Sequence, residues 1–196
     1  MPKIVDHEEQ RRKLSATVAR VVAERGLENT TLRNVAAHHG CTKGMVQHYF
    51  ADKEELLMGA LAYVEDCCAT RMSVRPQQQA GLDLLQSRLS AQLPLKPQIV
   101  EEWQVRLAFN TRAAISDDMR VALSERQAQQ LKVGVSCLRA AQKSGELKPD
   151  INLRNSYRSL VALVFGLGVG AVMDPGQLPP AAQRKILKTA IDGLRS

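Results

Sequence analysis

The chain has 196 residues, 44% hydrophobic and 24% charged, which is the composition of a soluble globular protein with one domain or a small domain fused to a larger one. Its net charge of +7 permits an anionic partner without proving one, and its 4% of aromatic residues leave aliphatic side chains to fill the core. The longest apolar run, 160–173, is too short to span a bilayer and contains glycines, so we expect no membrane insertion.

The first predicted helix carries one apolar stripe at helical spacing: Leu14, Val18, Val21 and Val22. Asp6 and Glu9 have the spacing of a capping box at its start. Gly26 is a suitable residue to end it.

Two short helices are predicted next, at Thr31–His39 and Thr42–Tyr49, joined by a two-residue turn. Asp52 and Glu55 form a second capping box, which opens a longer helix. That helix has an apolar face made by Leu57, Leu61 and Val64.

From about residue 76 the pattern changes to longer amphipathic segments separated by proline and glycine. Three of them are marked by Leu82, Leu85 and Leu89, ending near Pro94; by Val100, Trp103 and Leu107; and by Leu131, Val135 and Leu138, closed by Gly145 and Pro149. Residues 152–173 are apolar nearly all round and predict a buried helix. Pro179 and Pro180 introduce a last helix with an inner face of Leu187, Ile191 and Leu194.

No stretch alternates with the period of two that a strand requires, so the sequence predicts an all-α fold. We expect residues 1–52 to form an N-terminal three-helix domain with a helix-turn-helix. Residues 53–196 are predicted to form a C-terminal helical bundle.

The segment 31–50 meets the steric needs of a helix-turn-helix. The inward faces of its two helices are supplied by Val35, Ala36, Val46 and Phe50. Gly40 can adopt the left-handed conformation of the turn. We expect Cys41 to fill the core beneath that turn, and Thr42 to cap the second helix.

The second helix then turns a polar face outward: Lys43, Gly44, Gln47 and His48, with the ends of Met45 and Tyr49. Glycine inside a helix costs about 1 kcal/mol relative to alanine. Close approach of a DNA groove is one reason for Gly44, and fraying of the first turn is the other. The segment 1–50 also holds all four histidines and is more than twice as basic per residue as the remainder.

Lys43-Gly44, His48-Tyr49-Phe50, Lys53-Glu54 and Leu56 together resemble the DNA-binding signature of TetR-family repressors across residues 10–60. The resemblance implies that the second helix enters the major groove with Lys43, Gly44 and Gln47 near base edges, and we add Met45 for its exposed end. It implies phosphate contacts from Thr31, Thr42, His48, Tyr49 and Lys53. Gln47 stands where the family commonly has an aromatic residue, which leaves the operator sequence open. Taken singly, Lys43, His48 and Lys53 also fit ordinary solvated surface residues.

The C-terminal region is similar to the betaine-repressor, or BetI-like, branch of the same family through Glu102-Trp103 with Phe109, Ser144-Gly145-Glu146-Leu147 and Leu178-Pro179-Pro180. This similarity implies a ligand pocket inside the bundle and a dimer built from the last two helices.

Four aromatic residues are candidate pocket walls, with plain core packing as the alternative for each: Trp103, Phe109, Tyr157 and Phe165. A choline-like cation requires such residues to converge into a cage, and the ligand itself stays unknown. The predicted dimer interface consists of Gly166, Gly168, Gly170, Leu187 and Ile191. Packing within one protomer is the alternative reading of the glycines.

The cysteines Cys41, Cys67, Cys68 and Cys137 have no CxxC spacing, which fits a reduced cytoplasmic protein. Cys41 with His38 or His48 matches no familiar zinc ligand spacing, so we expect no metal and no cofactor.

The sequence therefore predicts a homodimeric transcriptional repressor that binds an inverted-repeat operator in double-stranded DNA and is released by a small-molecule effector. An enzyme is disfavoured because no histidine follows residue 50, no cofactor motif is present, and the acidic pairs Glu101-Glu102 and Asp117-Asp118 are each adjacent in sequence, so that they do not face one cavity. A helix-turn-helix adaptor without a ligand remains the second alternative.

Overall fold

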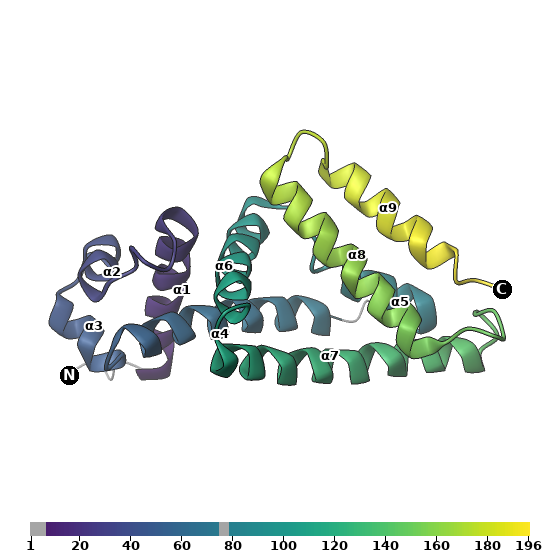
Figure 1. The fold of residues 1–196 in the computed structure, drawn as a ribbon, viewed down its shortest axis with the longest axis horizontal. Coiled ribbons are helices and arrows are strands. Elements are labelled where there is room, and N and C mark those ends of the chain that lie inside the picture. Colours follow the sequence, from purple (N-terminus) through teal and green to yellow (C-terminus); the bar gives the residue numbers. More distant parts are fainter. Residues whose placement is uncertain (1–6, 75–78) are drawn as a thin grey trace, which may run out of the picture. The chain divides into compact units, whose positions relative to one another are not determined.

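The computed structural model describes residues 7–74 and 79–196, apart from the side chains of residues 118, 122 and 126. Helices make up most of this part of the chain, and its only β pairing is an isolated bridge between Leu147 and Arg195 (Figure 1). The helices are α1 (His7–Arg25), α2 (Leu32–His39), α3 (Lys43–Tyr49), α4 (Lys53–Ser73), α5 (Gly81–Ser90), α6 (Pro97–Ala113), α7 (Asp117–Lys143), α8 (Leu153–Met173) and α9 (Pro180–Asp192). The predicted all-α fold is confirmed.

The chain divides into two compact units. The N-terminal unit comprises residues up to 67 together with 101–112, and the C-terminal unit comprises 68–100 and 113–196. The division falls within α4 and α6, so each of these helices contributes to both units. The boundary expected at residue 52 between a DNA-binding and a ligand-binding part is a statement about function and stays a prediction.

The core of the N-terminal unit is aliphatic, as the predicted stripes require. It includes the apolar stripe of α1 and the expected face of α4: Leu14, Val18, Val21, Val22, Leu57, Leu61 and Val64. Gly26, with a φ of 76°, ends α1 in the left-handed conformation that favours glycine. Asp52 caps α4, because its Oδ1 accepts the Glu55 backbone N–H at 2.8 Å. Asp6, expected to open α1, lies outside the described residues.

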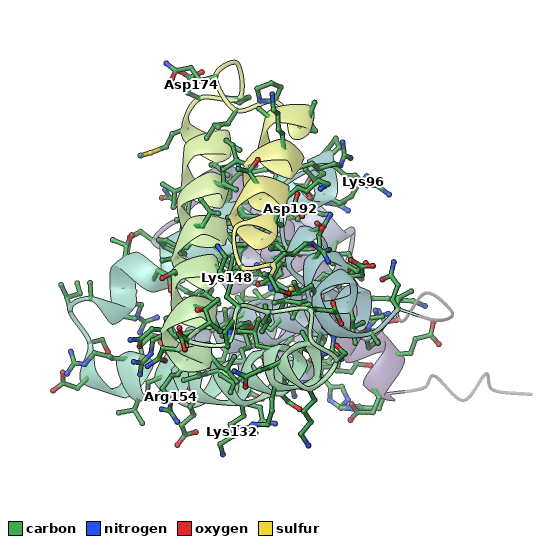
Figure 2. All side chains as sticks on the ribbon, turned by 90° about the vertical axis from the view of Figure 1, so that its right-hand side faces the viewer. Lys96, Lys132, Lys148, Arg154, Asp174 and Asp192 are labelled. Atoms are coloured by element: carbon green, nitrogen blue, oxygen red, sulfur yellow. The ribbon has the colours of Figure 1, made fainter. Side chains whose placement is uncertain are left out.

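In the C-terminal unit, α5 packs against α7 and α9, and α8 packs against both α7 and α9. Figure 1 shows α8 and α9 side by side, joined by the short connection that carries Asp174 in Figure 2. The predicted face of α5 is buried: Leu82, Leu85 and Leu89.

The start of α5 is closed by a residue from far along the chain. The Glu146 carboxylate accepts the Leu82 backbone N–H at 3.0 Å and the Ser144 hydroxyl at 2.7 Å. Gly81 has a φ of 55°, and a Cβ there would lie 2.0 Å from Glu146 Oε1. The Ser144–Leu147 segment therefore has a structural role in the C-terminal unit as a cap for α5.

Two of the predicted helix faces differ from the observed ones. In α6, Trp103 and Phe109 are buried but Val100 and Leu107 are only half-buried; in α7, Leu138 is buried but Leu131 and Val135 are half-buried. Helix α7 packs against both α5 and α8, so a single three-residue stripe does not define its buried face.

Helix α8 was expected to be buried all round, and this expectation is wrong. Its buried residues form one stripe, while Phe165 and Met173 are 44% and 79% exposed on the other face. The whole helix is longer than the apolar run 160–173. In length and composition it is the one helix among the described residues that meets the requirements for crossing a membrane, a test that core helices of soluble proteins also pass.

Candidate nucleic-acid interface

The turn between α2 and α3 is fixed by local hydrogen bonds. The Thr31 hydroxyl accepts the Asn34 backbone N–H, and the Thr42 hydroxyl accepts that of Met45, each at 3.2 Å. Gly40 has a φ of 76°, and the next N–H, that of Cys41, reaches the Ala36 carbonyl at 3.0 Å. The predicted glycine turn and the Thr42 cap are therefore confirmed.

The packing of the motif agrees with its predicted inward face, because all four expected core residues are buried: Val35, Ala36, Val46 and Phe50. Cys41 is the exception. It is only half-buried, and its Sγ lies 3.6 Å from the Thr42 carbonyl oxygen, while partial burial raises the pKa of its thiol. The backbone closes the turn, so the expected plug beneath it is not needed.

The outward face of α3 is formed as predicted by four exposed residues, beside a half-buried Met45: Lys43, Gly44, Gln47 and His48. A Cβ added at Gly44 would meet only the Thr42 Oγ1, at 3.9 Å. No contact among the described residues therefore explains why this helix position is glycine.

Tyr49 is less accessible than the sequence suggested. It is 9% exposed, so most of its side chain is packed within the protein. Its ring lies 4.7 Å from that of His7 and 5.1 Å from that of His48, measured between centroids. These contacts join the start of α1 to the end of α3 and hold the aromatic ring against the protein.

Lys53 is also tied to the protein. Its Nζ donates to the Glu28 backbone carbonyl at 2.9 Å and lies 4.0 Å from the carboxylate of the same residue. This lysine at the first residue of α4 thereby secures the loop that precedes α2. No sequence pattern indicated this contact, because the two residues are 25 positions apart.

Arg11 has a positioning role in this region that was not predicted from the sequence. One guanidinium nitrogen donates to the Tyr49 carbonyl at 2.9 Å and the other to Glu55 Oε1 at 2.8 Å, while the group lies 5.0 Å from the Phe50 ring centre. It satisfies a backbone carbonyl at the end of α3 that the helix itself leaves free. Arg11 therefore positions α3 from α1.

Glu55 completes this link at the start of α4. Its Oε2 accepts the Ala51 backbone N–H at 2.8 Å. This hydrogen bond first, and then the one from Arg11, lower the pKa of the Glu55 carboxyl. The capping box at residue 52 was the only sequence signal for this arrangement, and it did not point to α1.

The four candidate pocket aromatics are divided between the two units. Trp103 and Phe109 are buried in the N-terminal unit. In the C-terminal unit Tyr157 is buried, and burial raises the pKa of its hydroxyl to about 12. Phe165, however, is 44% exposed, so it lies on the outside of its protomer and is not an enclosed wall.

The residues expected at a dimer interface also fall into different settings. Leu187 and Ile191 are fully buried within the protomer, so their assignment to an exposed interface is corrected. Gly168 is buried too, and a Cβ at Gly170 would meet Leu178 Cδ1 at 2.5 Å, which indicates packing within the chain. Only Gly166 is exposed, with open space around it.

Within the described residues, no group of three or more His, Cys, Asp or Glu side chains is placed to hold a metal ion. The described cysteines are all free thiols.

A capped helix-turn-helix followed by an all-helical region defines the class of DNA-binding transcriptional regulators. Residues 82–196 match the family described as BetI-type transcriptional repressor, C-terminal, and residues 15–59 match the bacterial regulatory proteins of the tetR family. The chain therefore belongs to the TetR family of transcriptional regulators, with a BetI-type C-terminal region.

Relatives and solved structures agree over almost the whole length. The chain is 27% identical to the regulator PksA of Bacillus subtilis over 99% of this chain and 94% of PksA. It is 26% identical to the regulator BetI of Burkholderia ambifaria over 98% and 97% of the two chains.

Among solved structures, a transcriptional regulator from Rhodococcus sp. Rha1 has a TM-score of 0.77 at 29% identity and covers 94% of this chain and 95% of its own. A regulator from Saccharomonospora viridis, solved in complex with choline, has a TM-score of 0.87 at 22% identity over 96% and 99% of the chains. At that identity the second likeness shows the fold alone.

Proposed function

We propose that this regulator is a homodimeric repressor that binds an inverted-repeat operator and is released by a small-molecule effector. The observation that carries the DNA-binding part is the outward face of α3, which is exposed while both ends of the helix are held by side chains from its own unit. A short helix held in this way presents a rigid surface to the major groove.

The roles on this face divide between reading and positioning. Lys43 is long enough to reach guanine acceptors, and the Gln47 amide can bond adenine in two places. Thr31, Thr42, His48, Tyr49 and Lys53 are proposed to position the protein on phosphates, with Gly44 and Met45 close to the groove. For Lys53 this role requires sharing its ammonium group between a phosphate and the Glu28 carbonyl.

The proposed dimer uses the exposed face of α8. In the second half of the helix, after Leu160, the exposed residues recur at helical spacing along one stripe: Ala162, Phe165, Gly166 and Met173. Ile186 of α9, which packs beside α8, is a further large apolar side chain exposed at 37%. A second copy of the chain would cover this surface by a two-fold contact and place two α3 helices about one DNA turn, roughly 34 Å, apart.

The effector part rests on the BetI-type C-terminal match. The likeness to a regulator solved with choline supports a ligand in this kind of fold without giving its identity. A regulator that acts on DNA, with no chemistry of its own, works in the cytoplasm of a bacterium, and we propose that location for this protein.

The DNA-binding roles are tested by titrating duplexes across a range of salt concentrations with Gln47→Ala and Lys53→Ala. We expect Gln47→Ala to cost about 1–3 kcal/mol on the operator and to relax preference at particular base pairs. Lys53→Ala is expected to weaken operator and scrambled duplexes alike and to reduce the salt slope by about one phosphate contact per subunit.

Lys132→Ala is the matched control, because Lys132 is an exposed lysine on α7, away from the helix-turn-helix in the chain (Figure 2). Thermal unfolding of Lys53→Ala without DNA measures the loss of the hydrogen bond to the Glu28 carbonyl, separately from the loss of a phosphate contact. A change of sequence preference by Lys53→Ala, with Gln47→Ala changing affinity only, would contradict the division of roles.

A further inference from the structure

The C-terminal unit contains a guanidinium group that lacks an anionic partner. Arg88 of α5 donates through Nη1 to the Cys137 Sγ at 3.3 Å, and a thiol is a weak acceptor. Its Nε is buried without a hydrogen-bond partner, and none of the ion pairs among the described residues involves Arg88. Arg88 as a whole is half-buried, and leaving the buried part of a charged group unpaired is costly, so this group is suited to receive an anion.

A second donor lies on the same side of α7. Tyr157 of α8 is 3% exposed, and its ring packs on Gly134, where a Cβ would lie 1.9 Å from Cε2 and 2.1 Å from Cζ. Gly134 and Cys137 are three residues apart and share one face of α7. The hydroxyl end of Tyr157 is therefore brought to the part of α7 that Arg88 contacts through Cys137.

The Tyr157 hydroxyl takes part in none of the hydrogen bonds formed among the described residues. Burial raises its pKa to about 12, so the group keeps its proton and is a donor at neutral pH. Arg88 and Tyr157 thus supply one charged and one neutral donor, and among the described residues the only acceptor that either of them reaches is the weak Cys137 Sγ.

Buried aliphatic residues lie close in the chain to the three residues of this site. Leu85 lies one turn before Arg88, Leu138 follows Cys137, and Leu160 lies one turn after Tyr157, and all three are buried. A ligand bound here would meet hydrogen-bond donors at one end and apolar side chains elsewhere, which is the usual composition of a small-molecule site.

We propose that Arg88 and Tyr157 bind the acid group of an amphipathic organic carboxylate, and that this carboxylate is the effector of the regulator. The effector role of the carboxylate rests on the proposed function, whereas its binding to Arg88 and Tyr157 does not. The like charge of Arg88 disfavours a quaternary ammonium ion at this position, so the site selects against a choline-like ligand.

Thermal unfolding without DNA tests binding, with octanoate as the probe and the uncharged octanamide as its partner. At a hundredfold excess over Kd we expect octanoate to raise the Tm of the wild-type protein by about 5 °C or more, and octanamide to raise it much less. Arg88→Met removes the octanoate shift, and Tyr157→Phe reduces it. Arg139→Met, which alters an exposed arginine of α7, leaves it unchanged.

Without any ligand, Arg88→Met is expected to unfold at the same temperature as the wild type or higher, because it removes a half-buried charge whose Nε has no hydrogen-bond partner. The proposal is overturned if octanoate leaves the wild type unshifted, if octanamide matches it, or if Arg88→Met and Tyr157→Phe respond like the wild type. Should Arg88→Met not fold, Tyr157→Phe alone decides through its reduced shift.

A DNA titration of the same proteins separates this inference from the proposed function. Octanoate is expected to weaken operator binding by the wild type at least tenfold and by Arg88→Met very little. If octanoate binds but operator affinity is unchanged, the effector role is overturned while the site stands. If the wild type binds no DNA at all, the proposed function fails instead.

Discussion

The seven-residue α3 and the second half of the 21-residue α8 each turn one face outward, but the two faces have opposite chemistry. The face of α3 is polar and remains well hydrated when nothing is bound. The face of α8 carries exposed Phe165 and Met173, whose hydration is unfavourable. The polar face of α3 is therefore suited to a transient binding partner, whereas the apolar face of α8 is suited to a permanent one.

The two helices are also held in place by different forces. Hydrogen bonds from Thr42 and Arg11 fix the ends of α3, which is too short to be stable by itself. Burial of one apolar stripe against α7 and α9 fixes α8. Substitutions should therefore affect α3 through specific polar contacts and α8 through the area that it covers.

The largest expected effect compares two phenylalanines. Phe50 is fully buried, so Phe50→Ala should lower the free energy of unfolding by about 3–5 kcal/mol. Phe165→Ala should change the stability of an isolated protomer far less but weaken the proposed dimer. Chemical denaturation measures the protomer stability, and light scattering at several protein concentrations measures dimer formation. Equal losses of stability for the two variants would contradict the expected difference between a core and a surface phenylalanine.

A smaller effect is expected from Arg11→Met, which removes the tie between α1 and the end of α3. Because Arg11 is partly exposed, we expect a loss of about 1 kcal/mol in stability, together with weaker operator binding. Arg20→Met is the control, since Arg20 is an exposed arginine on the same helix. Unaltered operator affinity in Arg11→Met, measured under conditions where both variants are folded, would show that Arg11 does not position α3.

Gly166→Ala should increase the stability of the protomer but weaken the proposed dimer. Space around Gly166 is open, so alanine should stabilise the helix of a protomer by about 0.5–1 kcal/mol. If a second protomer packs on this glycine, the added methyl group weakens the dimer. Chemical unfolding at low protein concentration measures the expected gain in protomer stability, and the molecular mass at high protein concentration measures the expected loss of dimer. If Gly166→Ala strengthened the dimer, the interface would not include Gly166.

The smallest effect is the pH dependence due to Glu55. The folded protein lowers the pKa of this carboxyl, so its contribution is fully present above the unfolded pKa of about 4.3 and is lost as the pH falls through the folded pKa. The stability difference between the wild type and Glu55→Gln should therefore shrink on acidification below about pH 4.

Local features of the fold were predictable from the sequence, and distant contacts were not. The caps at Thr42 and Asp52 and the turns at Gly26 and Gly40 depend on residues within five positions of each other, so the pattern was enough. The contacts of Arg11 and Lys53 cross 25 or more positions and left no pattern.

The C-terminal region was harder to predict for a related reason. Apolar spacing identifies a helix but does not say which neighbour covers which face. Leu187 and Ile191 were assigned to a dimer interface and are core residues, whereas Phe165 was assigned to a pocket and is exposed. The Arg88 site escaped notice because its members come from three helices that are separated in the chain.

The tie between the end of the chain and α5 has a consequence for the order of events during synthesis. Arg195 pairs with Asp83 at 2.9 Å across 112 positions, and the Ser196 backbone N–H donates to the Glu146 carbonyl at 3.1 Å. These contacts form only after residues 195 and 196 have left the ribosome. The local turns of α2 and α3 can form much earlier, so the C-terminal unit should complete its packing after them. Until then its apolar surfaces are exposed, and we expect it to depend more on chaperones that prevent aggregation.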